Sequence, residues 1–418
     1  MSEWKEYRLG DVCEISSSKR IFAQEYTIEG IPFFRGKEII EKQRGTSVST
    51  ELYISHKRYN EIKNKFGVPQ KGDMLLTSVG TLGIPYVVKD EQFYFKDGNL
   101  TWFRNFNDIV VDFLYYWILS KYGRSQIESR AIGTTQRALT IENLRKFEIN
   151  LPPLDEQRRI ASILSSLDDK IAVNRRICEN LEAQAQALFK HWFIDFAPFK
   201  DGKFVESELG MIPEGWRVGT LGEHVDNLGG YSYKGSELQP SSVAMATIKN
   251  FIRGGGFKIE GYKEIIISKN IKDYQYIQLF DVLVAHTDLT QNAEVVGNPA
   301  IILSTAGYDK LIMSMDLTKV IPKDKRLTTP LLHLILSTKK FKEHALGYVN
   351  GTTVLHMNKK AVPEYKLAMP NNLDVLEDLS SFMDSLYKRM AIIYAENLRL
   401  SALRDTLLPK LMSGQIKL

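Results

Sequence analysis

The sequence predicts an α+β protein made of two similar globular domains and two long helices that pair as an antiparallel coiled coil. Two observations lead to this prediction: short patterns recur in the same order in both halves of the chain, and a long stretch of helical apolar spacing follows each copy. The chain has 418 residues, more than one typical domain, and 44% of them are hydrophobic, which is ordinary for a folded protein.

The internal repeat rests on four matches whose offset drifts slowly along the chain. The first two share an offset of 212 residues, the third has an offset of 208 and the fourth an offset of 218. The matching segments are Trp4 with Leu9–Asp11 and Trp216 with Leu221–Glu223, Arg35–Ile39 and Thr247–Phe251, Asp73–Leu76 and Asp281–Val284, and Gly133–Thr135 and Gly351–Thr353. An ordered series of this kind indicates two copies of one module.

The first part of each copy reads as strands and turns. In copy one, short β-branched and aromatic runs bounded by turn residues predict strands at 31–34, 73–79, 85–88 and 93–95. The stretch 113–121 predicts a helix among them, and its apolar run, 113–119, is too short to span a bilayer. The globular parts are therefore expected to be small, irregular α+β domains.

The second part of each copy predicts a long helix with a heptad seam. The seams step by three or four residues, and each contains one asparagine, which weakens packing but fixes register. The seam positions are Ile160, Leu164, Leu167, Ile171, Asn174, Cys178, Leu181, Ala185, Leu188 and Trp192 in copy one, and Leu376, Leu379, Met383, Leu386, Met390, Ile393, Asn397 and Leu400 in copy two. Two matching seams favour pairing with each other over packing of each helix on its own domain.

These patterns define five segments. They are a first globular domain at 1–152, a central long helix at 153–193, a linker at 194–215, a second globular domain at 216–370 and a C-terminal long helix at 371–418. About 38 helical residues at about 1.5 Å each would span about 57 Å, which exceeds the roughly 34 Å of one turn of B-DNA. An antiparallel helix pair with a pseudo-twofold axis would thus act as a spacer between two oppositely oriented globules.

Several strings give the chain a resemblance to a known family. They are the opening Trp4–Val12, Lys71–Gly83, Gly133–Gln136 with Leu139, Leu151–Ala161, Trp192–Phe199 with Leu209–Trp216, and the ending Leu407–Ile416. Together, over nearly the whole chain, they resemble the specificity (S) subunit of a type I restriction-modification system. Copy two departs from the pattern, because His286 stands where copy one continues toward Gly-Thr-Leu-Gly, and Val354 replaces Gln136.

The resemblance implies a function and partners. Each globular domain would be a target-recognition domain that reads one half of a bipartite double-stranded DNA target, and the helices would set the unread gap. The helices would also dock two methyltransferase (M) subunits, which restriction (R) subunits then join. The chain itself would have no catalytic residues, metal or cofactor; S-adenosylmethionine, ATP and Mg would belong to the partner subunits.

Motifs for independent chemistry are missing from the sequence. It has no Asn/Asp-Pro-Pro-aromatic loop for base methylation, no Walker-A motif and no H-E-x-x-H. Its two cysteines, Cys13 and Cys178, are too far apart in sequence for a Cys-x-x-Cys site. With no secretory signal and no apolar membrane segment, we expect a cytoplasmic protein. The 55 basic and 50 acidic residues give a net charge of only +5. A charge this small does not by itself argue for a nucleic-acid partner.

The DNA-binding candidates are basic and polar turn residues, the types that contact phosphates and base edges. In copy one they are Lys19, Arg20, Arg35, Lys37, Thr77, Ser78, Thr81, Thr134, Thr135, Gln136 and Arg137. In copy two they are Tyr231, Lys234, Lys249, Asn250, Arg253, His286, Thr287, Gln291 and Asn292. Lys37 and Lys249 occupy equivalent repeat positions, which favours them over the others, since any single candidate could be a solvated loop residue.

Two alternatives stay open at the level of sequence. The chain could be a coiled-coil adaptor whose globular domains bind protein, or a self-contained DNA methyltransferase or nuclease with an unrecognised site. The sequence does not specify the DNA target, the length of its gap, the individual base contacts or whether the chain is stable without partners.

Overall fold

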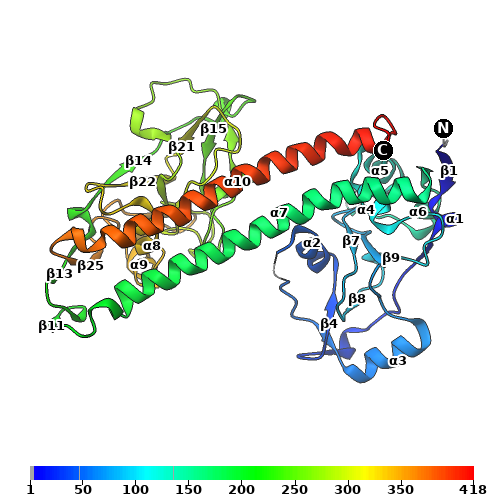
Figure 1. Ribbon diagram of the computed structural model, residues 1–418, viewed down its shortest axis with the longest axis horizontal. Coiled ribbons are helices and arrows are strands. Elements are labelled where there is room, and N and C mark those ends of the chain that lie inside the picture. The colour runs from blue at the N-terminus through cyan, green and yellow to red at the C-terminus, as the bar shows by residue number, and fades with distance from the viewer. Residues whose placement is uncertain (1–3, 47, 135) are drawn as a thin grey trace. The chain divides into compact units, whose positions relative to one another are not determined.

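Two helices of 36 residues each, α7 (Leu154–Phe189) and α10 (Glu377–Met412), are the longest elements that the structure describes (Figure 1). The computed structural model describes residues 4–46, 48–134 and 136–418. Each helix begins with two acidic residues in its first turn, where negative charge stabilises the positive end of the helix dipole. The chain divides into unit 1 (Met1–Val173 with Arg399–Leu418) and unit 2 (Asn174–Leu398), so both helices contribute to both units.

Within each unit, α7 and α10 pack antiparallel. In unit 1, Ile160 and Leu164 of α7 share a hydrophobic core with Leu411 of α10. Further along α7, Asp168 Oδ1 accepts from Arg404 Nη1 at 2.7 Å. In unit 2, Ala185 and Phe189 near the end of α7 share a core with Leu376 and Leu379 near the start of α10. The start of α7 thus lies beside the end of α10, and the end of α7 lies beside the start of α10, as the two seams predict.

The same antiparallel sheet occurs in both units. Its strand order is β2-β9-β6-β7 in unit 1 and β14-β22-β18-β20 in unit 2. The strands are Glu14–Ser16, Leu100–Arg104, Met74–Thr77 and Pro85–Val87 in unit 1, and Val225–Gly229, Leu317–Pro322, Val282–Ala285 and Pro299–Ile301 in unit 2. All four residues of β6 and all four of β18 are buried, which explains their continuous apolar runs.

A second small sheet completes each globular part. Its order is β3-β5-β4-β8 in unit 1 and β16-β15-β21-β17 in unit 2, and each sheet contains one parallel pair, β4·β8 or β15·β21. The strands are Tyr26–Thr27, Tyr53–Ile54, Ile31–Phe34 and Tyr94–Phe95 in unit 1, and Lys263–Glu264, Val243–Ala246, Lys310–Met313 and Tyr276–Ile277 in unit 2. A short helical segment directly follows β4 and β15: α2 (Gly36–Arg44) and a 3₁₀ turn (Ile248–Asn250).

The strands predicted at 31–34, 73–79, 85–88 and 93–95 are confirmed, with shorter bounds at three of them. The helix predicted at 113–121 is two helices, α4 (Val111–Leu119) and α5 (Lys121–Arg130). Ser120 separates them because it takes an extended backbone and caps α5, while its hydroxyl donates to Trp117 O at 2.6 Å. Unit 2 has the matching pair α8 (Thr329–Leu336) and α9 (Lys339–Leu346).

A two-stranded ribbon closes each globular part: β1 (Lys5–Arg8) with β10 (Glu148–Leu151), and β13 (Trp216–Thr220) with β25 (Lys366–Pro370). Gly10 and Gly222 follow the first strand of each ribbon in close contact with the chain opposite. An added Cβ would lie 3.0 Å from Arg145 Cβ at Gly10 and 2.9 Å from Pro363 Cβ at Gly222. The repeated Leu-Gly of the sequence therefore marks the same close backbone approach twice.

The remaining elements are short or lie in the linker. Residues 194–215 contain a hairpin of β11 (Phe204–Ser207) and β12 (Gly210–Pro213), so the predicted linker is ordered. The others are α1 (Leu9–Val12), α3 (His56–Phe66), α6 (Ile141–Arg145), β19 (Thr287–Asp288), β23 (Val349–Asn350) and β24 (Leu355–Met357). None of the helices in the described ranges combines the length and apolar content needed to cross a bilayer.

Candidate nucleic-acid interface

In unit 1, two loops predicted to contact DNA lie side by side. The loop that follows β6 and the loop that contains Gly133 are joined by backbone hydrogen bonds: Leu139 N donates to Ser78 O at 2.8 Å, and Gly80 N donates to Arg137 O at 3.2 Å. Ser78 N in turn donates to Asn99 O at 2.8 Å, beside the start of β9. The first loop is therefore held on both sides by backbone contacts.

Unit 2 contains the same arrangement at the offsets that the repeat predicts. Met357 N donates to His286 O at 2.9 Å, and His286 N donates to Asp316 O at 2.7 Å. His286 thus occupies the place of Ser78. Gln291 also joins the two loops of unit 2, because its side-chain amide donates to Thr352 O.

Glycine is required in the second loop of each unit. Gly133 has a φ of +92° and Gly351 a φ of +123°, both in the region that side chains disfavour. A Cβ would lie 2.7 Å from Gln136 O at Gly133 and 2.1 Å from Val354 O at Gly351. The Gly-Thr-Thr repeat thus marks a tight turn that exposes Thr134 and Gln136 in unit 1. Thr135 lies outside the described residues.

Lys37 and Lys249 lie on equivalent capped turns. In unit 1, Arg35 N donates to Glu38 Oε2 at 2.7 Å; in unit 2, Thr247 N donates to Asn250 Oδ1 at 2.9 Å. The capping side chains Glu38 and Asn250 are fully buried, whereas the lysine that precedes each is exposed. Burial opposes ionisation of Glu38, but hydrogen bonds from Arg35 outweigh it and hold the pKa of this carboxyl below its usual value.

The capped turn adjoins the first loop in each unit. In unit 1, a Cβ added to Gly36 would lie 3.9 Å from Thr77 Cγ2. In unit 2, Asn298 Nδ2 donates to Ile252 O at 3.3 Å, and Arg253 Nε lies 3.3 Å from Glu294 Oε2. A lysine-bearing turn and a hydrogen-bonded loop therefore form one surface region, which we call the reading surface of each unit.

Five of the predicted contact residues have buried side chains, and we remove them from the candidate set. Their exposed fractions are 4% or less, and each side chain makes an internal hydrogen bond, so it is not presented to a ligand. They are Thr77, which accepts from Ile84 N; Ser78, which bonds Thr101; Tyr231, which donates to Glu237; Asn250, the cap described above; and Thr287, which donates to Asp316. Their polar groups stabilise the protein through internal hydrogen bonds and do not face solvent.

The other candidates remain accessible to different degrees. The exposed ones are Lys19, Arg20, Lys37, Thr81, Thr134, Gln136, Lys234, Lys249, Arg253, Gln291 and Asn292. Four arginines have acidic partners: Arg20 with Asp97 at 2.7 Å, Arg35 with Glu38 at 2.9 Å, Arg137 with Glu128 at 2.6 Å and Arg253 with Glu294 at 3.3 Å. DNA would have to compete with these carboxylates, whereas the lysine ion pair Lys37–Glu41 is longer, at 3.8 Å.

His286 is half-buried near His356 and Lys359. Burial lowers its pKa, and the nearby His356 and Lys359 lower it further, against the opposing effect of Asp316. Its Nδ1 is buried and makes no hydrogen bond within the described part of the chain. At the position that matches Ser78, unit 2 therefore carries a larger side chain, His286, whose Nδ1 can still accept or donate a hydrogen bond.

Sequence reasoning missed Asp288, which organises the first loop of unit 2. Its carboxylate accepts from Thr290 N at 2.8 Å, Val295 N at 2.6 Å and Val296 N at 3.2 Å. Burial opposes its ionisation, but these backbone donors hold the pKa of Asp288 below its usual value. An aspartate at the end of a strand, just before a turn whose amides it can accept, is a recognisable signal, so the residue could have been found.

Comparisons with known proteins find similar sequences over nearly the whole chain. Residues 1–183 match the family described as Type I restriction modification DNA specificity domain. The type I restriction enzyme MjaIX specificity subunit of Methanocaldococcus jannaschii is 25% identical and aligns over 99% of this chain and 94% of its own length. The HindI specificity subunit of Haemophilus influenzae is 25% identical over the full length of both chains. The first 183 residues are thus similar to this family, and nearly the whole chain is similar to type I specificity subunits.

The fold of this chain is shared with a solved structure. A crystal structure of a type I restriction-modification S subunit from M. genitalium has a TM-score of 0.61 at 17% identity, and the match covers 98% of this chain and 96% of that chain. At this identity the likeness concerns the fold alone. It confirms the predicted α+β fold with repeated domains and two long helices.

Proposed function

We propose that this chain is the non-catalytic subunit that gives a type I restriction-modification complex its DNA specificity. Unit 1 and unit 2 would each read one half of a bipartite double-stranded target. Similarity to type I specificity subunits over nearly the whole chain supports the general role. The reading surfaces support the bipartite mode, because each unit has one of its own.

One observation carries the DNA-reading part of the proposal: the reading surfaces share a frame but differ in the side chains on it. Lys37 and Lys249 occupy the same exposed place, suited to a phosphate contact that carries no sequence information. Between the frames, the exposed Gln136 is replaced by Val354, and the half-buried His286 stands where unit 1 has the buried Ser78. A common phosphate contact with different groups near the bases is what two different half-sequences require.

The two long helices would set the gap between the half-sites. Both run from one unit into the other, and in each unit they are packed together, which supports a role as a spacer. Two methyltransferase subunits and then restriction subunits would join this chain on the DNA in the cytoplasm. Those partners would supply S-adenosylmethionine, ATP and Mg chemistry.

Selection from a randomised duplex pool tests the proposal, using this chain purified together with its methyltransferase subunit. We expect recovery of a motif with two defined halves and a fixed gap. Recovery of DNA without sequence preference would contradict the proposal and favour a coiled-coil adaptor for proteins. Methylation or cutting by this chain alone would instead favour a self-contained enzyme.

A further inference from the structure

The connection that follows β6 in unit 1 and β18 in unit 2 is longer in unit 2. In unit 1, the seven residues 78–84 join β6 to β7. In unit 2, the equivalent connection from β18 to β20 has thirteen residues, 286–298. This connection is part of the reading surface, so unit 2 has additional chain at the place where we propose that it meets DNA. We call residues 286–298 the extended loop.

Two charged side chains hold the extended loop from inside. The carboxylate of Asp288 is buried and accepts three backbone amides of the loop, as described above. Lys342 of α9 binds the opposite kind of group, because its Nζ donates to Val296 O at 2.6 Å and to Ala293 O at 3.0 Å. The same Nζ donates to Asn298 Oδ1 at 2.8 Å. The chain itself therefore fixes the conformation of the loop, which lowers the cost of ordering it on a ligand.

This conformation leaves an apolar side chain exposed. Leu289 directly follows β19 and is 64% exposed. Two further exposed apolar side chains lie on segments that are hydrogen-bonded to the extended loop. Ile252 is 45% exposed, and its carbonyl accepts from Asn298 Nδ2 at 3.3 Å. Met315 is 53% exposed and precedes Asp316, whose carbonyl accepts from the first amide of the loop at 2.7 Å. Single exposed apolar residues are common, but three on adjoining segments indicate a binding surface.

The equivalent positions of unit 1 are less apolar. Gly98 stands where unit 2 has Met315, because the next residue, Asn99, makes the matching backbone bond to the loop of unit 1. The repeat offset of 212 residues places Ile40 at the position of Ile252, and Ile40 is half-buried. Among the described residues, unit 2 thus presents more apolar surface at this place than unit 1 does. Two half-sequences with different chemical groups on their base edges would require such a difference.

The major groove of DNA offers one apolar group on a base edge, the 5-methyl group of thymine. We propose that Leu289, on the loop held by Asp288 and Lys342, contacts a thymine methyl group in the half-site of unit 2. Leu289 is then a specificity-determining residue, and Asp288 and Lys342 are positioning residues. This inference rests on the proposed function and adds the chemical group that unit 2 recognises, beside the phosphate contact assigned to Lys249.

The test replaces each thymine of the selected target by uracil in turn, which removes the methyl group and keeps the base pair. Binding is measured for the wild-type chain and for Leu289→Ala, each purified together with its methyltransferase subunit. For the wild-type chain, we expect uracil at one thymine of one half-site to weaken binding about fourfold, as the loss of one buried methyl group does. Leu289→Ala should bind the unmodified target more weakly, and uracil at that position should then have no further effect.

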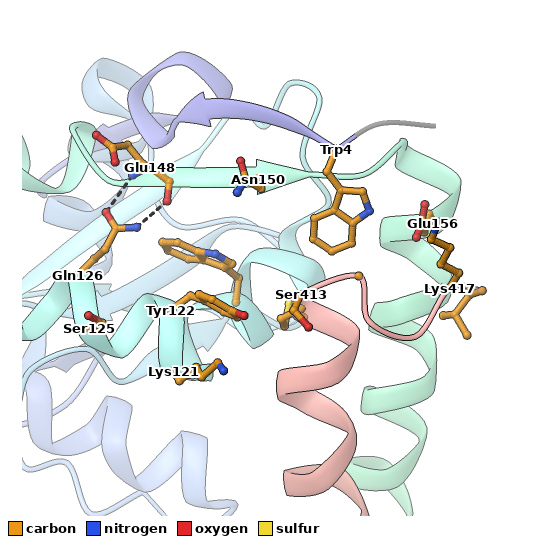
Figure 2. Close-up of a pocket in the computed structure, with 14 residues that line it drawn as sticks. Trp4, Lys121, Tyr122, Ser125, Gln126, Glu148, Asn150, Glu156, Ser413 and Lys417 are labelled. Carbon is orange, nitrogen blue, oxygen red and sulfur yellow. Dashed lines mark hydrogen bonds between the residues drawn. The ribbon is translucent and has the colours of Figure 1, made fainter. Parts of the chain in front are cut away.

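Two exposed apolar residues outside the reading surfaces provide matched controls. Leu279→Ala changes a leucine of unit 2 that precedes β18, whereas the extended loop follows that strand. Tyr122→Ala changes unit 1. Figure 2 shows Tyr122 near Trp4 at a hollow of about 1250 Å³, and no residue that lines this hollow is a candidate DNA contact. Both control variants should keep the fourfold sensitivity to uracil.

The outcomes separate this inference from the proposed function. If no thymine is sensitive to uracil, or if Leu289→Ala keeps the wild-type sensitivity, the inference is wrong, while a selected motif with two halves leaves the proposed function standing. If selection yields no such motif, both are wrong. Native mass spectrometry counts the methyltransferase subunits bound to each variant. Fewer subunits on Leu289→Ala than on the wild-type chain would assign Leu289 to a protein contact and would also overturn the inference.

Discussion

Asn174 Nδ2 donates to Asn397 Oδ1 at 2.8 Å, so the single asparagine in each heptad seam is bonded to the one in the other. Asn174 is 1% exposed and also donates to Glu396 Oε2 at 2.9 Å. Only one alignment of α7 against α10 brings the two amides together. The pair therefore fixes the register of the helices at a small cost in apolar packing.

Replacing Asn174 by alanine should destabilise the chain by about 1–2 kcal/mol, because Asn397 loses its donor inside the seam. Replacing both asparagines by leucine should restore or exceed the wild-type stability, since neither seam position then carries an unpaired amide. Denaturant unfolding of Asn174→Leu, Asn397→Leu and the double leucine variant measures the coupling, with Asn174→Ala measured beside them. Additive losses in the double variant would mean that the two amides do not interact.

The stability of unit 2 should depend on His333 in mild acid. His333 is buried in α8, with Nδ1 3.1 Å from the hydroxyl of Tyr387, and burial lowers its pKa from 6.5 to about 4. Because the folded-state pKa is the lower one, the unfolded chain binds more protons in this range. The contribution is present above pH 6.5 and is lost as the pH falls toward 4, by about 3 kcal/mol in total.

The His333→Gln variant should therefore lose less stability than the wild-type chain between pH 6.5 and pH 4. Chemical unfolding at several pH values measures the free energy of unfolding of both chains. Subtracting one curve from the other cancels the contribution of the carboxylates, which both chains share. His191→Gln, at an exposed histidine of unit 2, is the control and should follow the wild-type curve. Parallel curves for the wild-type chain and His333→Gln would show that His333 is not the titrating group.

Lys37→Ala and Lys249→Ala should each weaken DNA binding and reduce its salt dependence by about one charge, because each lysine would contact a phosphate of its own half-site. Affinity measured across a salt series gives the slope. Lys146→Ala, which removes an exposed lysine paired with Glu142, should leave the slope unchanged. An unchanged slope in either test variant would remove that lysine from the reading surface.

A heptad inserted into both long helices should lengthen the gap between the half-sites by about three base pairs. Seven residues add about 10.5 Å of helix at about 1.5 Å per residue, and each base pair spans about 3.4 Å. The insertions belong between Val173 and Asn174 and between Leu398 and Arg399, where both helices pass from one unit into the other. Selection of preferred targets measures the gap; the same gap in both proteins would mean that the helices are not the spacer.

The sequence by itself determined the repeat, the helix pair and the equivalence of Lys37 and Lys249. Periodicity is a local property, so the seam positions of α7 and α10 could be read directly and are largely buried, as Leu164 and Met383 are. The offsets of 208 and 218 residues also identified equivalent backbone positions, such as Ser78 and His286, before their hydrogen bonds were known. Patterns that depend on neighbours in the chain are visible without a fold.

Only the tertiary structure decided which polar side chains are available. Thr77 and Lys37 are both polar turn residues in sequence, yet Thr77 is buried against Ile84 N and Lys37 is exposed. The same holds for Trp4 and Trp216, which occupy equivalent positions in the repeat: Trp216 is 6% exposed, whereas Trp4 is only half-buried. Burial depends on segments that are far apart in the chain, and a linear pattern does not record which of them meet.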